Sequence, residues 1–238
     1  MAVIAHRGDH TKSPENTLAA YRSAILEGAD YVEADLRTTR DGHLVVLHDA
    51  TVNRMTGDTG AVSALSYREI EQMTIAPLVK SDKHTYHIPD FRSVLKLCKG
   101  HINIYLDFKD ADVARTYRLI KAAGMEKHIA VYLNKKKQYG LWRKVAPQIP
   151  LIESLPGEMT SEQGEDFLNH HVMGVVDNAY AQKTIRLLHQ QKIAVWVDEE
   201  DKEEGPAVWA EALKAGADGL QTDEPEKLIQ YLKGQGIR

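Results

Sequence analysis

The sequence predicts an α/β protein with the architecture of a (β/α)8 TIM barrel, in a single domain that spans residues 1–238. Two observations predict this fold. Short runs rich in apolar and β-branched residues alternate with helical patterns along almost the whole chain, which is typical of parallel βαβ units. In addition, 238 residues is an ordinary length for such a barrel, and a hydrophobic content of 43% is enough to fill its core.

The expected barrel strands are short apolar runs bounded by turn residues. They lie at residues 2–6, 31–35, 102–107, 129–133, 151–154, 173–176, 193–197 and 218–222. Helical patterns stand between them, at residues 15–28, 111–123, 141–146, 161–169, 182–191 and 206–215. Eight strands that are followed by helices in this way favour a closed barrel over an open sheet.

One region breaks the alternation. The turn Thr39–Gly42 contains an Asp-Gly pair, a strong hairpin signal, and joins the preceding strand to the run Leu44–Leu47 without a helix. Folding a hairpin about this turn returns His48 opposite Glu33. The polar, turn-rich segment at about 51–90 is then expected to be a small insertion after the hairpin strand that bears His48. An insertion over one end of the barrel would wall a site there.

Composition and charge exclude several classes of function. The net charge is −4, so the chain lacks the basic excess typical of nucleic-acid binding. Cys98 is the single cysteine, which excludes an intrachain disulfide and a cysteine-based zinc site. The N-terminus lacks the basic region of a signal peptide, and no apolar stretch approaches the roughly 20 residues of a membrane helix. We therefore expect a cytoplasmic protein without a membrane span.

Glu33 and Asp35 are the most informative pair of residues in the chain. They stand one residue apart in a predicted strand, so both side chains should project from the same face. Two adjacent carboxylates repel each other, which normally forces one of them to take up a proton. A bound Mg²⁺ or Ca²⁺ would remove that penalty, because these cations prefer oxygen ligands. The alternative is a pair of solvated carboxylates on an exposed strand.

Two segments near the N-terminus carry further candidates. His6 and Arg7 follow the first predicted strand and precede a glycine that would let a ligand approach the backbone closely. Arginine suits bidentate contact with a phosphate group. In the Ser-Pro-Glu-Asn-Thr segment that follows, Ser13 or Asn16 could cap the next helix. Alternatively, Glu15 and Asn16 belong to a ligand site, where they either contact the ligand or support the residues that do.

Asp107 and Lys109 repeat the same spacing at the end of another predicted strand. Asp107 would be a third oxygen ligand, and Lys109 would be a positive charge near a bound anion. Alone, such a pair is commonly a structural ion pair. Combined with the groups above, it gives two imidazoles, three carboxylates and two cationic groups at strand ends. That set suits a phosphodiester, whose oxygens a cation neutralises while one histidine takes a proton and the other gives one.

The order of these motifs resembles the glycerophosphodiester phosphodiesterase family. The resemblance is carried by HRG, PENT, GADYVEADLRTTRDGHLVVLHDATVNRMTG, IPDFRSVL, YLDFK and GADGLQTDEP. It is close over residues 5–109 and looser at the C-terminal strand. It implies a TIM barrel, one divalent cation (Mg²⁺ or Ca²⁺), and hydrolysis of a small-molecule glycerophosphodiester to an alcohol and glycerol 3-phosphate.

The resemblance also implies a role for each candidate. The acid/base pair would be His6 and His48, the metal ligands Glu33, Asp35 and Asp107, and the phosphate-site residues Arg7, Glu15, Asn16 and Lys109. Two features depart from the family pattern. The family commonly has glutamate where this chain has Asp107, and it usually continues its tryptophan-containing strand with Thr-Val-Asn where Trp196 leads into Val-Asp-Glu-Glu. Trp196 itself is expected either to wall the substrate pocket or to pack in the core.

Three other functions compete with this one. A related activity would be that of a lysophospholipase D on lipid diesters, which a long, open and apolar pocket wall would favour. A second alternative is a non-catalytic barrel that binds phosphodiesters. Only Asp107, which is shorter than the family's glutamate, supports it. Glycoside hydrolysis is disfavoured, because Glu33 and Asp35 would lie on one side of any substrate.

Three further histidines stand apart from this set. His10 follows His6 closely enough to lie near the site. The pair His170–His171 has no carboxylates at ligand spacing and is not expected to bind a metal.

Overall fold

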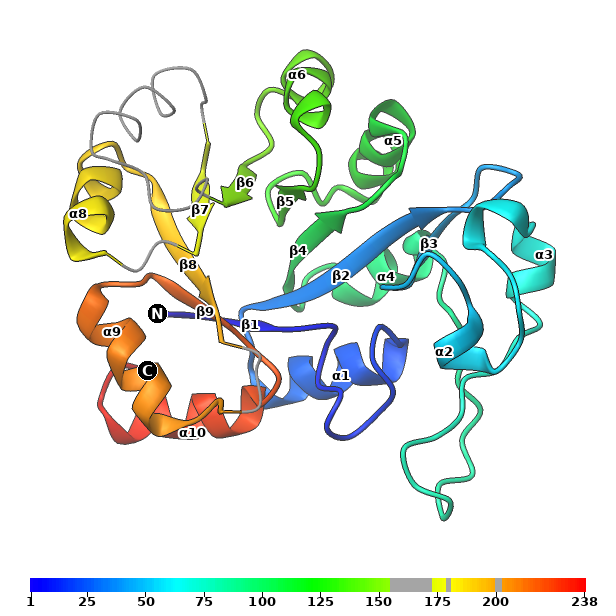
Figure 1. The fold of residues 1–238 in the computed structure, drawn as a ribbon, viewed down its shortest axis with the longest axis horizontal. Coiled ribbons are helices and arrows are strands. Elements are labelled where there is room, and N and C mark those ends of the chain that lie inside the picture. The colour runs from blue at the N-terminus through cyan, green and yellow to red at the C-terminus, as the bar shows by residue number, and fades with distance from the viewer. Residues whose placement is uncertain (155–172, 179–180, 200–202) are drawn as a thin grey trace.

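A closed ring of parallel strands forms the centre of the molecule, and helices surround it (Figure 1). The computed structural model describes residues 1–154, 173–178, 181–199 and 203–238. In chain order the barrel strands within these ranges are β1 (Ala2–Ala5), β2 (Tyr31–Thr38), β4 (Asn103–Phe108), β5 (Ile129–Leu133), β6 (Leu151–Ser154), β7 (Val175–Asp177), β8 (Ala194–Asp198) and β9 (Gly219–Thr222). Each pairs in parallel with the next, and β9 pairs with β1. This closure confirms the predicted barrel.

The helices pack on the outside of the ring (Figure 1). They are α1 (Leu18–Glu27), α4 (Phe91–Cys98), α5 (Val113–Ala123), α6 (Lys136–Val145), α8 (Gln182–Gln190), α9 (Pro206–Ala215) and α10 (Pro225–Gly234). Two of them, α4 and α10, were not among the expected segments, whereas the helix expected at 161–169 and the pair His170–His171 lie outside the described residues. Within the described part of the chain, no helix is long and apolar enough to cross a membrane.

The helix α6 begins earlier than its apolar pattern predicts. The sequence predicted a helix at 141–146, but α6 already starts at Lys136. Its first turn contains Gln138, which is buried and donates from Nε2 to the carbonyl of Phe108 at 2.8 Å. A polar side chain therefore occupies a position that faces the barrel, which hides the helical periodicity in the sequence.

β2 continues into an antiparallel hairpin with β3 (Leu44–Val46), as predicted. Gly42 in the turn has a φ of +78°, a left-handed conformation that glycine adopts without strain. The turn is a three-residue loop rather than the two-residue loop typical of an Asp-Gly pair. Extending the observed pairing therefore places His48 across from Ala34, and the predicted pairing with Glu33 is wrong by one residue.

The segment at residues 51–90 projects beside this hairpin (Figure 1). It contains the one-turn helices α2 (Asn53–Thr56) and α3 (Tyr67–Ile70) and the 3-10 turn η1 (Val62–Ala64). Its buried apolar side chains pack with those of β3 in one cluster, formed by Val45, Leu47, Val52, Val62, Ile70, Ile75 and Ile88. The insertion is thus fastened to β3 by a small core of its own.

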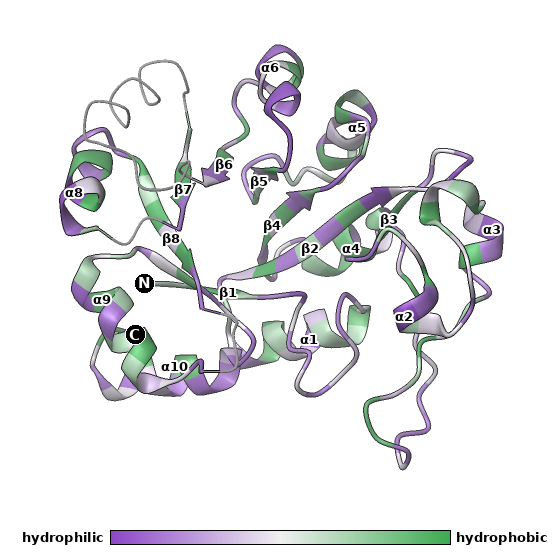
Figure 2. Cartoon of the chain, viewed as in Figure 1, coloured by the Kyte–Doolittle hydropathy of each residue, from purple (hydrophilic) through white to green (hydrophobic). Residues whose placement is uncertain are grey.

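Apolar side chains fill two layers. The larger layer lies between the strands and the helices, and Figure 2 shows hydrophobic residues along the strands and alternating with hydrophilic ones around the helices. A smaller cluster fills the inside of the barrel, with Ile4, Tyr105, Ala130, Ile152, Val175 and Trp196 as its buried members. A Cβ added at Gly219 would lie 2.6 Å from Cδ1 of the Trp196 ring, so this glycine makes room for the tryptophan.

Candidate active site

Three carboxylates converge on two neighbouring barrel strands. Glu33 and Asp35 lie on one face of β2, and Asp107 pairs directly with Asp35 across the register between β2 and β4. One carboxylate oxygen from each residue lies within 4.8 Å of the other two. The structure therefore brings together the three residues that the sequence marks as candidate metal ligands. We refer to Glu33, Asp35 and Asp107 as the carboxylate trio.

Burial makes the carboxylate trio costly without a cation. Glu33 is 2% and Asp35 1% exposed, and the Oε1 atom of Glu33 is buried without a hydrogen-bond partner. Burial, followed by the charges of Asp35 and Asp107, raises the pKa of Glu33 well above its usual range. Burial and Asp35 likewise raise the pKa of Asp107. An oxygen-preferring cation would relieve this repulsion, so the residues present fit Mg²⁺ or Ca²⁺.

Lys109 places a positive charge against the carboxylate trio. Its Nζ lies 3.0 Å from Oδ1 of Asp35 and also forms an ion pair with Asp107. Burial alone would lower the pKa of Lys109, but the charges of Asp35 and Asp107 outweigh it and raise that pKa. Asn134, which follows β5, donates to Asp107 and was not singled out from the sequence. The ammonium group is therefore held in its charged form beside the trio.

Arg7 and Asn16 orient the carboxylates of β2. Both have left-handed backbone conformations, with φ of 54° and 55°, which non-glycine residues seldom adopt. The Arg7 amide donates to Oε2 of Glu33 at 2.9 Å, and Nδ2 of Asn16 donates to Oδ2 of Asp35 at 2.7 Å. The Tyr21 hydroxyl donates to Oδ1 of Asn16 at 2.8 Å, which fixes the amide in this orientation. The strained loop thus connects β1 to the trio.

The N-terminal cap of α1 differs from both expected candidates. The cap residue is Thr17, whose hydroxyl oxygen accepts a hydrogen bond from the amide of Ala20. Neither Ser13 nor Asn16 caps this helix. The amide of Asn16 is instead used on Asp35, as the alternative interpretation expected.

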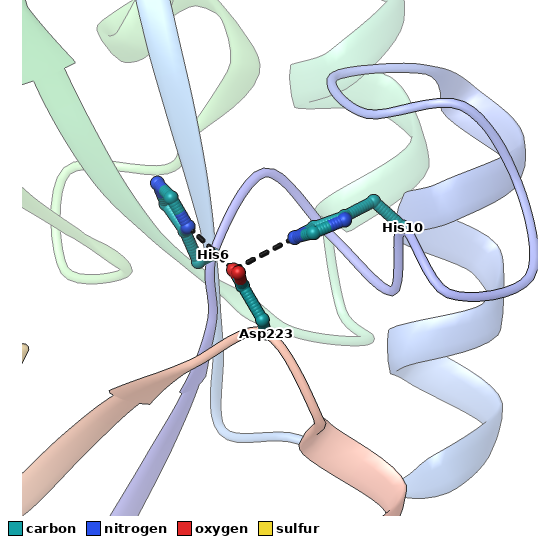
Figure 3. Close-up of side chains that lie close together, drawn as sticks. All are labelled: His6, His10 and Asp223. Carbon is teal, nitrogen blue, oxygen red and sulfur yellow. Dashed lines mark hydrogen bonds and ion pairs between the residues drawn. The ribbon is translucent and has the colours of Figure 1, made fainter. Parts of the chain in front are cut away.

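His6 lies at the end of β1, beside an unpredicted carboxylate. Its Nδ1 is 2.7 Å from Oδ1 of Asp223, which follows β9, and Nε2 of His10 is 2.7 Å from the same oxygen (Figure 3). Burial alone would raise the pKa of Asp223, but the hydrogen bonds from His10 and His6 outweigh it and lower that pKa. The hydrogen bond to Asp223 raises the pKa of His10. Because Nδ1 of His6 faces a carboxylate, Nε2 is the nitrogen left for chemistry.

His48 stands in the loop after β3 and is more open, with 38% of its side chain exposed. Its Nδ1 lies 3.0 Å from Oδ1 of Asp49. Arg37 of β2 donates from Nε to the carbonyl of His48 at 2.9 Å and forms an ion pair with Asp110 at 3.0 Å. The backbone of His48 is therefore tied to the strand that carries Glu33.

Comparison with known proteins decides the family. The model of the glycerophosphoryl diester phosphodiesterase family matches residues 6–227. The chain belongs to this family. It is accordingly an enzyme, a phosphoric diester hydrolase. A glycerophosphodiester phosphodiesterase of Caldanaerobacter subterraneus subsp. tengcongensis is 29% identical over an alignment that covers 98% of each chain.

Solved structures share the fold of this phosphodiesterase. The crystal structure of a glycerophosphodiester phosphodiesterase from Agrobacterium tumefaciens has a TM-score of 0.85 at 24% identity, and covers 97% of this chain and 99% of that chain. An Oleispira antarctica phosphodiesterase, solved in complex with the product sn-glycerol-3-phosphate, has a TM-score of 0.82 at 19% identity, with 98% and 97% covered. Because both identities are below 25%, these two structures establish only that the chain shares their barrel fold.

In this phosphodiesterase, Glu15 belongs to an ion-pair network that the sequence did not reveal. Arg54 of α2 donates to both oxygens of Glu15, at 2.7 and 2.9 Å, and to Oδ2 of Asp49 at 2.8 Å. Arg7 donates to Oε1 of Glu15 at 3.0 Å. Burial alone would raise the pKa of Glu15, but Arg54 and Arg7 outweigh it and lower that pKa. Arg54 therefore links the insertion to the loop before α1 and to the neighbour of His48.

Trp196 lies apart from these polar groups. Its side chain is 6% exposed and packs inside the barrel against Tyr31 and Tyr105, with ring centroids 4.8 and 5.9 Å away. The sequence left open whether Trp196 packs in the core or forms a wall of the substrate pocket, and the structure shows that it packs in the core of the barrel. A contact between Trp196 and the substrate stays a prediction.

Proposed function

We propose that this phosphodiesterase hydrolyses glycerophosphodiesters to an alcohol and glycerol 3-phosphate, with one divalent cation and histidine acid/base catalysis. The observation that carries the proposal is the carboxylate trio, of which Glu33 and Asp35 are buried and Oε1 of Glu33 has no hydrogen-bond partner. The Arg7 and Lys109 cations stand against the same carboxylates. Carboxylates that gather a divalent cation, together with two basic side chains, suit the charge of a phosphodiester. The product complex of the Oleispira relative supports the substrate class.

The carboxylate trio would hold the cation. Its donors are hard carboxylate oxygens, which favour Mg²⁺ or Ca²⁺ over Zn²⁺. When bound, such a cation acts as a Lewis acid that withdraws charge from a phosphoryl oxygen. Asp107, one methylene shorter than glutamate, is held in place by Lys109 and Asn134.

Arg7 and Lys109 would neutralise the remaining charge of the phosphate. The Arg7 guanidinium is held by Glu15 at 3.0 Å, and its Nε lies 3.7 Å from Asp35, so its position is fixed before a substrate arrives. Asn16 contributes by fixing Asp35. Glu15 and Asn16 therefore support the phosphate site through Arg7 and the trio.

His6 and His48 would exchange protons with the reacting oxygens. In both residues Nδ1 faces a carboxylate, Asp223 for His6 and Asp49 for His48, which leaves Nε2 free. One imidazole accepts a proton from the attacking hydroxyl as the new P–O bond forms. The other donates a proton to the leaving alcohol oxygen as the old P–O bond breaks. The attacking oxygen belongs either to water or to the substrate's own glycerol hydroxyl. In the second case a cyclic phosphate forms first and is then hydrolysed.

Product analysis tests this proposal. The enzyme is incubated with a panel of glycerophosphodiesters in the presence of Mg²⁺, Ca²⁺ or chelator, and released glycerol 3-phosphate is measured. We expect release with a cation, none with chelator, and none from Glu33→Gln. Glu211→Gln, an exposed position on α9, is the matched control and should behave as the wild type. Absence of glycerol 3-phosphate with every substrate and cation would contradict the proposal.

The same panel separates the two alternatives. A lipid diester with a single acyl chain, cleaved faster than any water-soluble diester, would assign the activity of a lysophospholipase D. Binding of a diester without turnover under any condition would indicate a non-catalytic barrel.

A further inference from the structure

A second group of ligand atoms lies at the mouth of the barrel. Within the described residues, two sets of three side chains have ligand atoms within 4.8 Å of one another, namely the carboxylate trio and the set His6, His10 and Asp223. Nδ1 of His6 and Nε2 of His10 each lie 2.7 Å from Oδ1 of Asp223. His6 directly follows β1, His10 lies in the loop before α1 and Asp223 directly follows β9, and both rings are directed at one oxygen (Figure 3). We refer to them as the His-His-Asp group.

The backbone holds the His-His-Asp group in place. The His6 amide donates to the carbonyl of Thr222 at 3.0 Å, and the Asp223 amide donates to Oε2 of Glu204 at 2.9 Å. The side chains of His6, His10 and Asp223 are 14%, 26% and 33% exposed, so an ion in solution can reach them. A set of ligands that is already assembled and reachable is what a metal site requires.

The ligand types differ from those of the carboxylate trio. Two imidazole nitrogens and one carboxylate oxygen suit Zn²⁺ and its neighbours Co²⁺ and Ni²⁺, whereas an all-oxygen set suits Mg²⁺ or Ca²⁺. Three protein ligands also leave the fourth tetrahedral position for water. Cys98 is buried, so no thiol competes for such an ion at this surface.

We propose that His6, His10 and Asp223 form a second, inhibitory metal site that takes Zn²⁺ or a similar transition-metal cation. The inhibition rests on the proposed function, in which His6 exchanges protons through Nε2. The cation binds the lone pairs of Nδ1 of His6 and Nε2 of His10, in place of the protons that bridge these nitrogens to Asp223. In each ring the bridging proton moves to the other ring nitrogen, or is released to solvent where the ring is already doubly protonated. The His6 ring then carries its one proton on Nε2, where it can accept no other, and as a neutral donor it is a very weak acid. His6 is thereby removed from acid/base catalysis.

Binding is measured independently of turnover. The enzyme is saturated with Mg²⁺ to fill the carboxylate trio and is then titrated with Co²⁺, whose visible absorption reports nitrogen ligands and low coordination number. We expect one Co²⁺ to bind with this absorption in the wild type, and the signal to be lost in His10→Ala and His10→Gln. His84→Ala is the matched control, because His84 forms a histidine–aspartate pair with Asp82 at 2.7 Å on the exposed surface without a second imidazole. It should keep the signal.

Inhibition is then measured as the ratio of rates with and without Zn²⁺ at saturating Mg²⁺. Loss of one ligand should raise the half-inhibiting Zn²⁺ concentration of both His10 variants by at least about tenfold, and His84→Ala should match the wild type. An unchanged Co²⁺ signal or Zn²⁺ response in the His10 variants would overturn the proposal, as would inhibition that excess Mg²⁺ relieves. Enzyme that binds Co²⁺ through His10 but hydrolyses no diester would instead contradict the proposed function.

Discussion

At the scale of single residues, Asp107 is the member of the carboxylate trio that departs from the family pattern. Asp107 pairs with Asp35 across two strands and receives hydrogen bonds from Lys109 and Asn134. These two donors hold the shorter carboxylate where the resemblance to the family leads one to expect a glutamate. Under the proposed function, the negative charge at this position should matter more than the length of the side chain, because the summed charge of three carboxylates would hold the cation.

This view predicts different outcomes for two substitutions at Asp107. Asp107→Glu should retain a good part of the activity and change the preference between Mg²⁺ and Ca²⁺, because it keeps the charge and adds reach. Asp107→Asn should be severely impaired, because it removes the charge. Rates measured as a function of each cation's concentration give both quantities. An Asn variant with unchanged rate and metal affinity would show that Asp107 is not a ligand.

The two histidines are predicted to differ in their dependence on the leaving group. A positioned acid or base is worth about 10²–10⁴-fold in rate, so His6→Ala and His48→Ala should each lose that much on a natural diester. A nitrophenolate leaves without protonation. Replacing the general acid should therefore spare a nitrophenyl diester, whereas replacing the general base should slow both substrates alike. Near-normal rates of both variants on a natural substrate would make the histidines structural.

At the scale of elements, the start of α1 sets the loop that carries Arg7 and Asn16. The hydroxyl oxygen of Thr17 accepts from the Ala20 amide, and its hydroxyl donates to the carbonyl of Pro14 at 2.7 Å. Thr17 therefore connects the first turn of the helix to the loop before it. Both bonds are buried, so no water can replace them without rearrangement.

Thr17→Ala is predicted to destabilise the fold. Loss of an N-cap hydroxyl typically costs about 0.5–2 kcal/mol of unfolding free energy, and the buried carbonyl of Pro14 loses its donor as well. Denaturant unfolding monitored by circular dichroism measures the change. Thr17→Ser, which keeps the hydroxyl, should change stability much less. Equal losses in the two variants would refute the assignment of the cap.

The periodicity of apolar residues predicted those helices and strands in which one face is apolar along the whole element. The alternation around Glu33 and Asp35 placed both carboxylates on one face, because strand geometry alone determines it. The same kind of argument missed the start of α6, where buried Gln138 interrupts the apolar stripe. It also missed the register of the hairpin before His48, which depends on the loop conformation rather than on its Asp-Gly pair.

At the scale of the whole molecule, the tertiary fold brings together residues whose spacing in the sequence does not predict that they are in contact. Asp223 reaches His6 because β9 pairs with β1, although 217 residues separate them in the chain. Arg54 reaches Glu15 because the insertion is fastened to β3 by its own apolar cluster. Both residues lie within motifs quoted for the resemblance, yet their partners depend on tertiary contacts. The candidate ligands were therefore predictable, and the residues that orient the two histidines and Glu15 were not.

The fold also brings together Asp9, in the loop before α1, and Glu27, at the end of α1, a carboxyl pair that makes stability depend on pH. Burial, and next the hydrogen bond with Asp9, raises the pKa of Glu27 from 4.5 to about 7, although Lys12 opposes this. A carboxyl group whose pKa is raised on folding stabilises the native state in its protonated form. That contribution is complete below pH 4.5 and is lost as the pH rises through about 7.

The unfolding free energy of the wild type should therefore fall relative to that of Glu27→Gln as the pH rises from about 5 to about 8. Denaturant unfolding at several pH values measures it, and Glu211→Gln should show no such trend. If the difference in unfolding free energy between the two proteins does not change with pH, or if the wild type gains stability relative to Glu27→Gln as the pH rises, then Glu27 and Asp9 do not share a proton in the folded state.

The central claim is that the carboxylate trio binds the divalent cation on which hydrolysis depends. Calorimetric titration of exhaustively dialysed enzyme with Mg²⁺ and Ca²⁺, with turnover measured on the same samples, tests it most directly. We predict that one cation binds to the wild type, that chelator abolishes turnover, and that Glu33→Ala and Asp35→Ala lose both binding and activity. Full activity of the dialysed wild type in excess chelator, or unchanged cation binding by both alanine variants, would contradict the account.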